Sequence, residues 1–211
     1  MQMPDDISGY RFRDETIPAH GYMVPPIRTI LAEEFGSARE RIFEVGCGKG
    51  DMAHALSDTY DIVGIDPSRE GIALANLKYP HLDLRLGSAY DDLAANFGSF
   101  KAAMSVDVVE YVAFPHKFAA NIFELLADGG IAIVSAPYHG YLKNIAIAAS
   151  GSMDFHFNSS QDYGRIKFWS IKTLGALMRD AGFVDITFRR VGRVPPLAKA
   201  MICIARKPPA S

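Results

Sequence analysis

Short apolar runs alternate with stretches of helical periodicity along the first two thirds of this 211-residue chain. A run such as 42–45, ended by glycines, is typical of a buried strand, and the apolar spacing in 51–60 is typical of a helix. Because parallel strands need crossover connections, this order predicts an α/β fold with a doubly wound, mostly parallel sheet. Strands are expected at 42–45, 62–65, 82–86, 102–106 and 131–135, and helices at 27–35, 51–60, 69–79, 90–97 and 116–126.

Gly129 and Gly130 are expected to end the helix 116–126. The alternation of strands and helices then stops after Pro137, which follows the strand 131–135. Residues 138–168 have no clean period and are rich in aromatic side chains, which indicates an insertion after the fifth strand that is helical over 142–149. Segments of this kind usually form lids or binding loops. We therefore expect 138–168 to lie over a ligand site.

Two further strands are expected near the end of the chain, at 184–191 and 200–205, after a helix that Ser170 caps. The link 192–197 contains two prolines and no helical pattern. Two strands joined without a crossover helix must pair antiparallel. The sheet is therefore expected to finish with an antiparallel strand.

The composition indicates one soluble domain, on which residues 1–41 form an N-terminal helical cap. Hydrophobic residues make up 49% of the chain and charged residues 22%, the balance of a globular protein. Its 22 basic and 24 acidic residues give a net charge of −2, which argues against a long contact with nucleic acid.

Cysteine usage and hydropathy set further expectations. The chain has two cysteines, Cys47 and Cys203, too few for a secreted disulfide framework. It has no apolar run of membrane length, and the acidic start Met1–Glu15 does not resemble a signal peptide. We therefore expect a cytoplasmic protein without membrane insertion. We expect no metal site either, because the histidines and aspartates of 138–168 lack ligand spacing.

The most informative segment is the glycine-rich turn 44–50, with the sequence Glu-Val-Gly-Cys-Gly-Lys-Gly. It follows the first expected strand and opens a helix, so it lies at the carboxyl end of the sheet, where open α/β sheets bind ligands. Asp66 ends the next strand, 20 residues after Gly46 (66 − 46 = 20). A carboxylate at that place can accept both hydrogen bonds of a ribose diol, which predicts an adenosine-containing cofactor.

The spacing of the turn distinguishes between cofactors. Dinucleotide-binding turns favour Gly-x-Gly-x-x-Gly, whereas the third glycine here comes one residue early. Glu44, two residues before the first glycine, would repel a pyrophosphate but attract the ammonium and sulfonium groups of S-adenosylmethionine. The turn therefore favours the methyl donor over NAD.

Seven stretches support a family resemblance: 44–50, 64–68, 87–90, 107–112, 126–130, 135–137 and 168–183. On these residues the chain resembles the class I S-adenosylmethionine-dependent methyltransferases, and within them the branch of ubiquinone-biosynthesis O-methyltransferases and their small-molecule relatives. The resemblance implies a Rossmann-like sheet of seven strands with the last antiparallel. It also implies S-adenosyl-L-methionine as cofactor and transfer of a methyl group to a small-molecule acceptor, most simply at oxygen.

The resemblance also implies roles for single residues. Gly46 and Gly48 should face the methionine part of the donor, and Glu44 should orient the turn and favour the ammonium group. Cys47 lies in the same turn, where a small packing residue is favoured over a nucleophile. The other implied donor contacts are Asp66 on the ribose, Pro67 on the adenine face, Ser88, Ala89 and Tyr90 at the adenine edge, and Asp107 at the methionine end.

The acceptor side is less defined, because relatives often carry His where this chain has Tyr111. An oxygen acceptor of high pKa needs a base. The candidate catalytic residues are His139, directly after the fifth strand, and His156, between two phenylalanines, with His139 preferred. Either histidine could instead be a capping or packing residue. The aromatic side chains of 138–168 indicate a pocket for an apolar or aromatic acceptor, or the core beneath a lid.

Several other functions were weighed against this hypothesis. DNA amino-methyltransferases usually show Asn/Asp-Pro-Pro-aromatic after the fourth strand, where this chain reads 105–108 as Ser-Val-Asp-Val, and no cysteine follows a proline as C5-methylating enzymes need. Tyr163 and Lys167 have the spacing of a short-chain dehydrogenase pair, but Gly164 weakens a helix there. A protein methyltransferase and a non-catalytic S-adenosylmethionine-binding protein stay open as alternatives.

Overall fold

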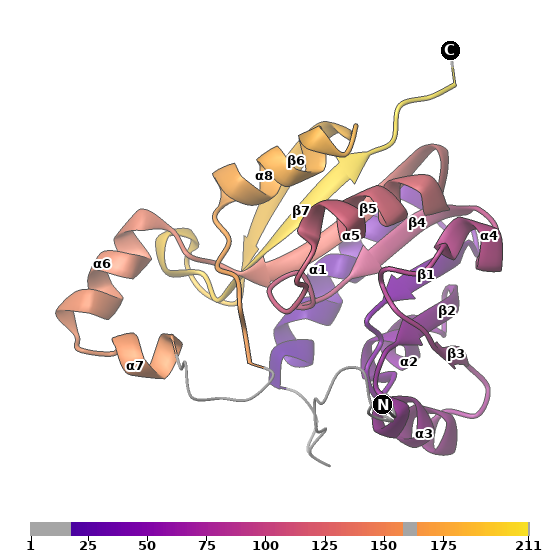
Figure 1. Cartoon of the computed structure of the whole chain (residues 1–211), viewed down its shortest axis with the longest axis horizontal. Helices are drawn as coiled ribbons and strands as arrows, with labels where there is room; N and C mark the ends of the chain where they lie inside the picture. The colour runs from indigo at the N-terminus through magenta and orange to yellow at the C-terminus, as the bar shows by residue number, and fades with distance from the viewer. Residues whose placement is uncertain (1–17, 158–163, 211) are drawn as a thin grey trace, which may run out of the picture.

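A seven-stranded sheet forms the centre of the computed structural model, which describes residues 18–157 and 164–210. The strand order is β3-β2-β1-β4-β5-β7-β6 (Figure 1). The strands are β1 Arg41–Val45, β2 Asp61–Asp66, β3 Asp83–Leu86, β4 Phe100–Ser105, β5 Leu126–Pro137, β6 Val184–Val191 and β7 Ala200–Arg206. β7 pairs antiparallel with both β5 and β6, while the pairs among β1 to β5 are parallel. The predicted fold class, with its antiparallel last strand, is confirmed.

Helices cover both faces of this sheet, as expected for a doubly wound fold. One buried cluster joins the sheet to three helices and includes Met23, Met52 and Ile72. The second cluster lies on the other face and includes Leu93, Phe118 and Leu174. The first three helices are α1 Pro18–Phe35, α2 Asp51–Leu56 and α3 Arg69–Lys78, and the others are α4 Leu93–Phe97, α5 Pro115–Leu125 and α8 Ile171–Asp180.

The insertion after β5 contains α6 Tyr141–Ala149 and α7 Met153–His156, which project away from the sheet (Figure 1). The expected helix over 142–149 is therefore present, and α7 is an addition to it. Residues 158–163 of the expected lid, including Tyr163, lie outside the described residues, as do residues 1–17 of the N-terminal cap.

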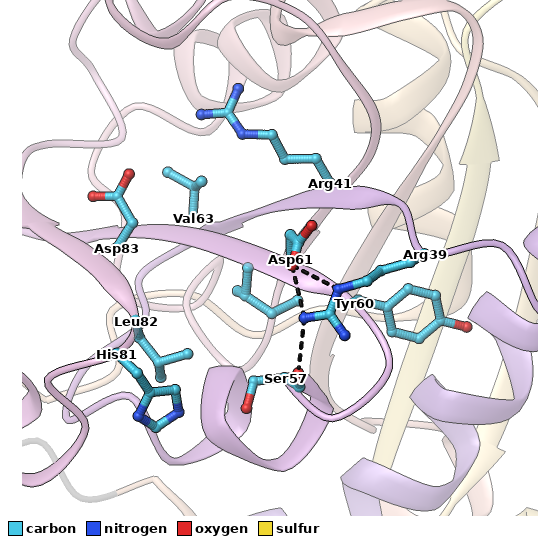
Figure 2. Close-up of a pocket in the computed structure, with 10 residues that line it drawn as sticks. Arg39, Arg41, Ser57, Tyr60, Asp61, Val63, His81, Leu82 and Asp83 are labelled. Atoms are coloured by element: carbon cyan, nitrogen blue, oxygen red, sulfur yellow. Dashed lines mark hydrogen bonds and ion pairs between the residues drawn. The ribbon is translucent and has the colours of Figure 1, made fainter.

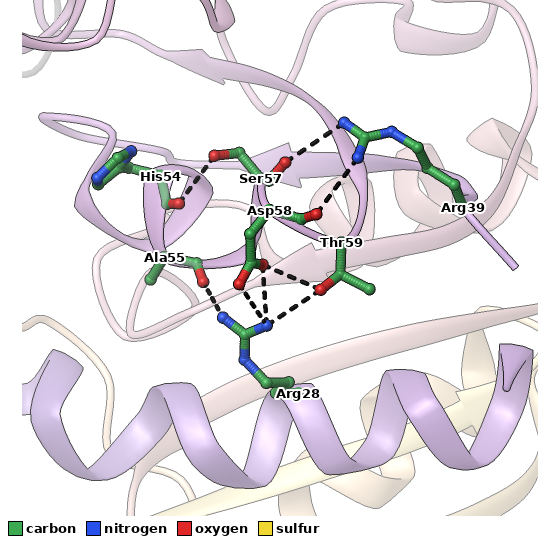
Figure 3. Close-up of polar contacts among 7 residues, drawn as sticks. All are labelled: Arg28, Arg39, His54, Ala55, Ser57, Asp58 and Thr59. Atoms are coloured by element: carbon green, nitrogen blue, oxygen red, sulfur yellow. Dashed lines mark hydrogen bonds and ion pairs between the residues drawn. The ribbon is translucent and has the colours of Figure 1, made fainter. Parts of the chain in front are cut away.

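Hydrogen bonds and ion pairs fix α1 against the rest of the domain. Arg28 of α1 donates to the carbonyl of Ala55 in α2 and, beyond the end of that helix, to Asp58 Oδ1 at 2.9 Å and Thr59 Oγ1 at 3.1 Å (Figure 3). Arg206 of β7 donates to both carboxylate oxygens of Glu34 at 2.8 and 2.7 Å. The C-terminal half of α1 is thus held against the sheet and α2 by these contacts.

Four local expectations were wrong. α1 begins at Pro18 rather than near residue 27, because Pro25 and Pro26 lie inside the helix and interrupt its apolar period. α5 passes directly into β5 at Leu126, so Gly129 and Gly130 lie within the strand and do not end the helix. The link 192–197 holds a short 3-10 helix, η1 Pro195–Leu197. α7 was not expected, because its four residues make a single helical turn, which is too short to show a periodic pattern of apolar residues.

One expected helix cap is confirmed. The Ser170 side chain accepts a hydrogen bond from Thr173 N, and Ser170 N donates one to Thr173 Oγ1, which completes a capping box at the start of α8. Among the described helices, none combines the length and apolar character needed to cross a membrane.

Candidate donor and acceptor site

The turn after β1 is bent by three glycines in the left-handed region. Gly46, Gly48 and Gly50 have φ values of +82°, +54° and +78°. The amides of Gly46 and Cys47 both donate to the carbonyl of Ile65, at 2.8 and 2.9 Å, which closes the turn against the end of β2. The turn therefore lies at the carboxyl edge of the sheet, as the sequence predicts.

Gly46 also allows a close approach by the loop after β4. A Cβ atom at Gly46 would lie 2.4 Å from Cγ2 of Val108 and 3.1 Å from its Cγ1. No real Cβ atom shows such a contact, so either Val108 or the turn would have to move. The absence of a side chain at Gly46 is thus a requirement of the packing as well as of the backbone.

Asp66 holds the glycine turn through its carboxylate. Its Oδ2 accepts a hydrogen bond from Gly48 N at 2.9 Å, and its Oδ1 accepts one from Ser68 N at 2.8 Å. The carboxylate therefore lies beside the glycine turn, as the 20-residue spacing predicts.

Glu44 is the most informative group at the site. It is 2% exposed and its Oε2 has no hydrogen-bond partner. Burial, together with the charges of Asp66 and Asp51, raises the pKa of Glu44 to about 8. A buried carboxyl oxygen without a donor is costly. It fits a cofactor that brings an ammonium group to this turn.

The loop after β3 lies next to Asp66. Gly87 N donates to the carbonyl of Asp66 at 3.1 Å, and within the loop Ser88 Oγ accepts from Tyr90 N at 3.2 Å. Asn121 of α5 donates to the carbonyl of Ala89 at 2.8 Å, which fixes the loop from the other side. The predicted adenine-edge segment is thus brought beside the predicted ribose residue, and Pro67 lies between Asp66 and the cap of α3.

Asp107 follows β4 in an unusual backbone conformation. Its φ is +55°, which is rare for a residue with a side chain. Ser135 of β5 holds it from two sides: the serine hydroxyl accepts from Asp107 N at 2.9 Å and donates to Asp107 Oδ1 at 2.9 Å. Non-glycine residues held at such φ values often lie at functional sites.

Glu110 was not singled out from the sequence as a site residue. It is 1% exposed, neither of its carboxyl oxygens has a hydrogen bond, and Arg165 Nε lies 3.7 Å from its Oε1. Burial and the charge of Asp107 raise the pKa of Glu110 to about 8. Burial, together with the charges of Asp107 and Glu110, raises the pKa of Tyr22 on α1, and the charge of Arg165 opposes this shift. The buried carboxyl of Glu110 thus belongs to a polar cluster with Asp107, Arg165 and Tyr22.

His139 lies among aromatic rings. Its ring centroid is 5.4 Å from both Phe157 and Phe168, and its Nδ1 is buried without a hydrogen bond. Burial and the positive charge of Lys143 lower the pKa of His139 to about 4. His156 is less buried; burial and Lys143 lower its pKa as well. Both histidines therefore belong to the insertion side of the site and are neutral at pH 7.

Cys47 and Cys203 are both buried free thiols. Burial, with the charge of Glu44, raises the pKa of Cys47, so it is a thiol rather than a reactive thiolate. Cys47 packs in the apolar cluster beneath the turn, in keeping with a packing role. Within the described ranges, no group of three or more metal-binding side chains is found.

A separate cavity of about 290 Å³ lies at the opposite edge of the sheet. It is lined at the starts of β1, β2 and β3 by residues that include Arg41, Asp61 and Asp83 (Figure 2). Arg39 at its rim donates to Asp61 Oδ1 at 2.8 Å and is therefore already paired. No residue of the glycine turn contributes to this cavity, so we do not assign the predicted chemistry to it.

The fold and the turn define a class of protein. A glycine-rich turn after the first strand, with an acid at the end of the second, is typical of α/β proteins that bind a nucleoside cofactor at the carboxyl edge. A family described as a methyltransferase domain matches residues 19–187. The chain therefore belongs to this family of methyltransferase domains, and the cofactor that such a domain implies is S-adenosyl-L-methionine.

Curated relatives are similar over part of their length. The chain is 31% identical to the ubiquinone biosynthesis O-methyltransferase of Caulobacter sp. (strain K31) over 117 residues, which are 53% of this chain and 46% of that protein. It is 28% identical to the protein of the same name from Psychrobacter arcticus over 160 residues, 71% of this chain and 61% of the relative. The chain thus spans about half the length of these relatives.

Solved structures share the fold at low identity. A SAM-dependent methyltransferase from Archaeoglobus fulgidus has a TM-score of 0.66 at 12% identity, covering 87% of this chain and 92% of that one. The [4+2]-cyclase SpnF has a TM-score of 0.65 at 18% identity, covering 88% and 81%. The same fold therefore supports different reactions, and the acceptor must be argued from the site.

Proposed function

We propose that this enzyme methylates an oxygen atom of a small, largely apolar acceptor. The names of the curated relatives support an O-methyltransferase. The observation that carries the proposal is Glu110, a buried carboxyl beside Asp107 whose pKa of about 8 suits a proton acceptor for a phenolic hydroxyl. The aromatic rings of His139, Phe157 and Phe168 supply an apolar wall for such an acceptor.

The residues around the glycine turn are proposed to hold the donor. Glu44 would receive the ammonium group, Asp66 the ribose hydroxyls, and the backbone at Gly46 and Gly48 the methionine part. At the other end, Pro67, Ser88, Ala89 and Tyr90 would surround the adenine, with Asp107 near the methionine. When bound, S-adenosyl-L-methionine supplies a methyl group activated on a sulfonium. The protein's task is then to align the acceptor oxygen, exclude water and accept a proton.

Two residues compete for the role of proton acceptor. His139 is proposed from the sequence, but a pKa of about 4 makes it a weak base near pH 7. Glu110 is a stronger base because its conjugate acid has a pKa of about 8, and it becomes available as the pH rises through that value. We therefore favour Glu110 and keep His139, and after it His156, as the alternatives.

The pH dependence of kcat separates these candidates. Wild-type turnover of a catechol is expected to rise through about pH 8, as Glu110 loses its proton. Glu110→Gln should lower kcat by about 100-fold and flatten the profile, since general base catalysis is worth roughly 10²–10⁴-fold. His139→Gln is the matched control and should leave the rise in place. A flat wild-type profile from pH 6 to 9 that only His139→Gln reduces would assign the role to the histidine.

The positioning of Asp107 by Ser135 gives a second test. Ser135→Ala removes two hydrogen bonds that hold a residue with φ of +55°, so Asp107 is expected to relax toward an ordinary conformation. Loss of these bonds should lower kcat/KM by about tenfold, in line with roughly 1–2 kcal/mol of lost hydrogen bonding. Ser57→Ala is the control, because Ser57 makes an exposed hydrogen bond far from the turn. Equal kcat/KM for both variants would contradict the role of Ser135.

Transfer of a labelled methyl group tests the acceptor class. Purified enzyme with labelled S-adenosylmethionine is expected to label catechol and simple phenols, with no incorporation into RNA, DNA or protein. Labelling of nucleic acid or protein alone would support those alternatives instead. Binding of S-adenosylhomocysteine by calorimetry, with no transfer to any acceptor, would support a non-catalytic binding protein.

A further inference from the structure

We propose that the acceptor is an amphiphilic anion, in which the reacting hydroxyl is carried on an apolar body that also bears a carboxylate or phosphate group. The inference rests on the proposed function and names the substrate class for the same site. It is carried by the charges and the apolar side chains that three separate segments bring to the acceptor side.

The three segments are 138–157, 164–169 and 192–199, and their charge is strongly one-sided. Their basic residues are Lys143, Arg165, Lys167, Arg193 and Lys199, and their acidic residue is Asp154. Five positive charges and one negative charge give a formal charge of +4, whereas the whole chain has −2. The rest of the chain does not share this excess, so the positive charge is concentrated where the acceptor is expected.

Contacts bring the segments together. Lys143 Nζ of α6 donates to the carbonyls of Ala198 at 3.0 Å and Lys199 at 3.4 Å, which ties the insertion to the β6–β7 link. The backbone of 164–169 reaches the loop after β4, since Ile166 N and Lys167 N both donate to the carbonyl of Glu110 at 3.0 Å. All three segments therefore meet at the carboxyl edge of the sheet.

The positive charges are close enough to act on one another. After burial itself, the charges of Arg193 and Arg165 both lower the pKa of Lys143. The groups of opposite sign that act on Arg165 are Asp107, Glu110 and the hydroxyl of Tyr111. Glu110 keeps its proton near neutral pH because its pKa is raised to about 8, so it offsets little of this charge. An anionic ligand would relieve the repulsion.

Apolar side chains are concentrated on the same segments. Among the described residues, nine of the thirteen large hydrophobic side chains that are exposed lie in these segments. Phe155 is 86% exposed, Tyr141 is 81% exposed and Val194 is 65% exposed. Side chains of this kind rarely gather on a surface without a partner. Next to a cluster of cations, they suit a ligand with both an apolar body and a negative charge.

A pair of acceptors that differ in charge alone tests the inference. The probes are 3,4-dihydroxybenzoate and 3,4-dihydroxybenzamide, which have nearly the same shape. The benzoate is expected to show kcat/KM about tenfold above that of the amide, mainly through KM. Arg193→Met should reduce this preference by raising the KM of the benzoate toward that of the amide. Lys101→Met, at the start of β4 on the opposite edge, is the matched control and should keep the preference.

The outcomes separate this inference from the proposed function. Equal kcat/KM for benzoate and amide, with both methylated, would overturn the anionic acceptor and leave O-methylation intact. Methylation of neither probe, nor of catechol, would contradict the proposed function itself. Sedimentation with phosphatidylglycerol vesicles tests whether the positive residues bind a lipid surface instead. The inference would be overturned if Arg193→Met abolished vesicle binding and the wild-type enzyme showed no preference between the two probes.

Discussion

Gly46→Ala is expected to abolish binding of S-adenosylhomocysteine, the product of the donor. The new Cβ would lie 2.4 Å from Val108 Cγ2, and the backbone at Gly46 has φ of +82°. Either Val108 or the turn would have to move, and the positive φ strains the turn in both cases, including the amides that donate to Ile65. Calorimetry should show a loss of affinity of more than 100-fold, and the free energy of unfolding should fall by about 2–4 kcal/mol.

Gly36→Ala is the matched control for this substitution. Gly36 also has a positive φ, +60°, but a Cβ atom there would meet nothing within 4 Å. Alanine at Gly36 is expected to cost about 1 kcal/mol through the backbone alone and to leave donor affinity unchanged. If both variants bind S-adenosylhomocysteine equally well, the glycine turn does not form the donor site.

Glu44→Gln is expected to stabilise the protein while it weakens donor binding. The pKa of Glu44 rises from 4.5 in the unfolded chain to about 8 in the folded one, so the folded state binds the extra proton between these values. The free energy of unfolding therefore falls as the pH rises from about 4.5 to about 8. At pH 7 the uptake of a proton by Glu44 on folding costs on the order of 3 kcal/mol, and a neutral glutamine avoids much of this cost.

Urea unfolding from pH 5 to pH 8.5 measures this effect. Wild-type stability should decline from about pH 6.5 to about pH 8 through Glu44 and Glu110, whereas below about pH 6.5 the lowered pKa of His139 acts in the opposite direction; Glu44→Gln should remove about half of the decline. The same variant should bind S-adenosylhomocysteine about 10- to 100-fold more weakly, since it loses a charged partner for the ammonium group. Glu124→Gln, on the exposed face of α5, is the control. An unchanged slope in Glu44→Gln would mean that Glu44 ionises freely.

Much of the sheet could be predicted because its strands are buried on both faces and read as apolar runs. Ile42–Val45 and Ile62–Ile65 are of this kind, and each lies within an observed strand. The errors fall where local chemistry and tertiary packing disagree. Pro25 and Pro26 conceal the start of α1, and Gly129 and Gly130 suggest a helix end although their segment pairs as part of β5.

The donor side was predictable for a different reason. Glu44, Gly46 and Asp66 lie within one strand–helix–strand unit, so their sequence spacing fixes their relative positions. The acceptor side draws on α1, the loop after β4, the insertion and the β6–β7 link. Glu110 and Arg165 are 55 residues apart (165 − 110 = 55), and neither has a local pattern that predicts their 3.7 Å approach. The signals that the sequence offered for the acceptor side were the aromatic side chains of 138–168 and the excess of positive charge in the three segments.

The order of the strands has a consequence for synthesis. β7 lies between β5 and β6, so β6 has no partner in the sheet until the last strand has been made. During translation, β1 to β5 can pair with one another before β7 is made, whereas β6 cannot yet join the sheet. The nascent chain can thus form the glycine turn 44–50 first. The β6–β7 link on the proposed acceptor side can take its place only when Ala200–Arg206 has left the ribosome. A ribosome stalled before this strand would present a domain able to hold the donor without a finished place for the acceptor.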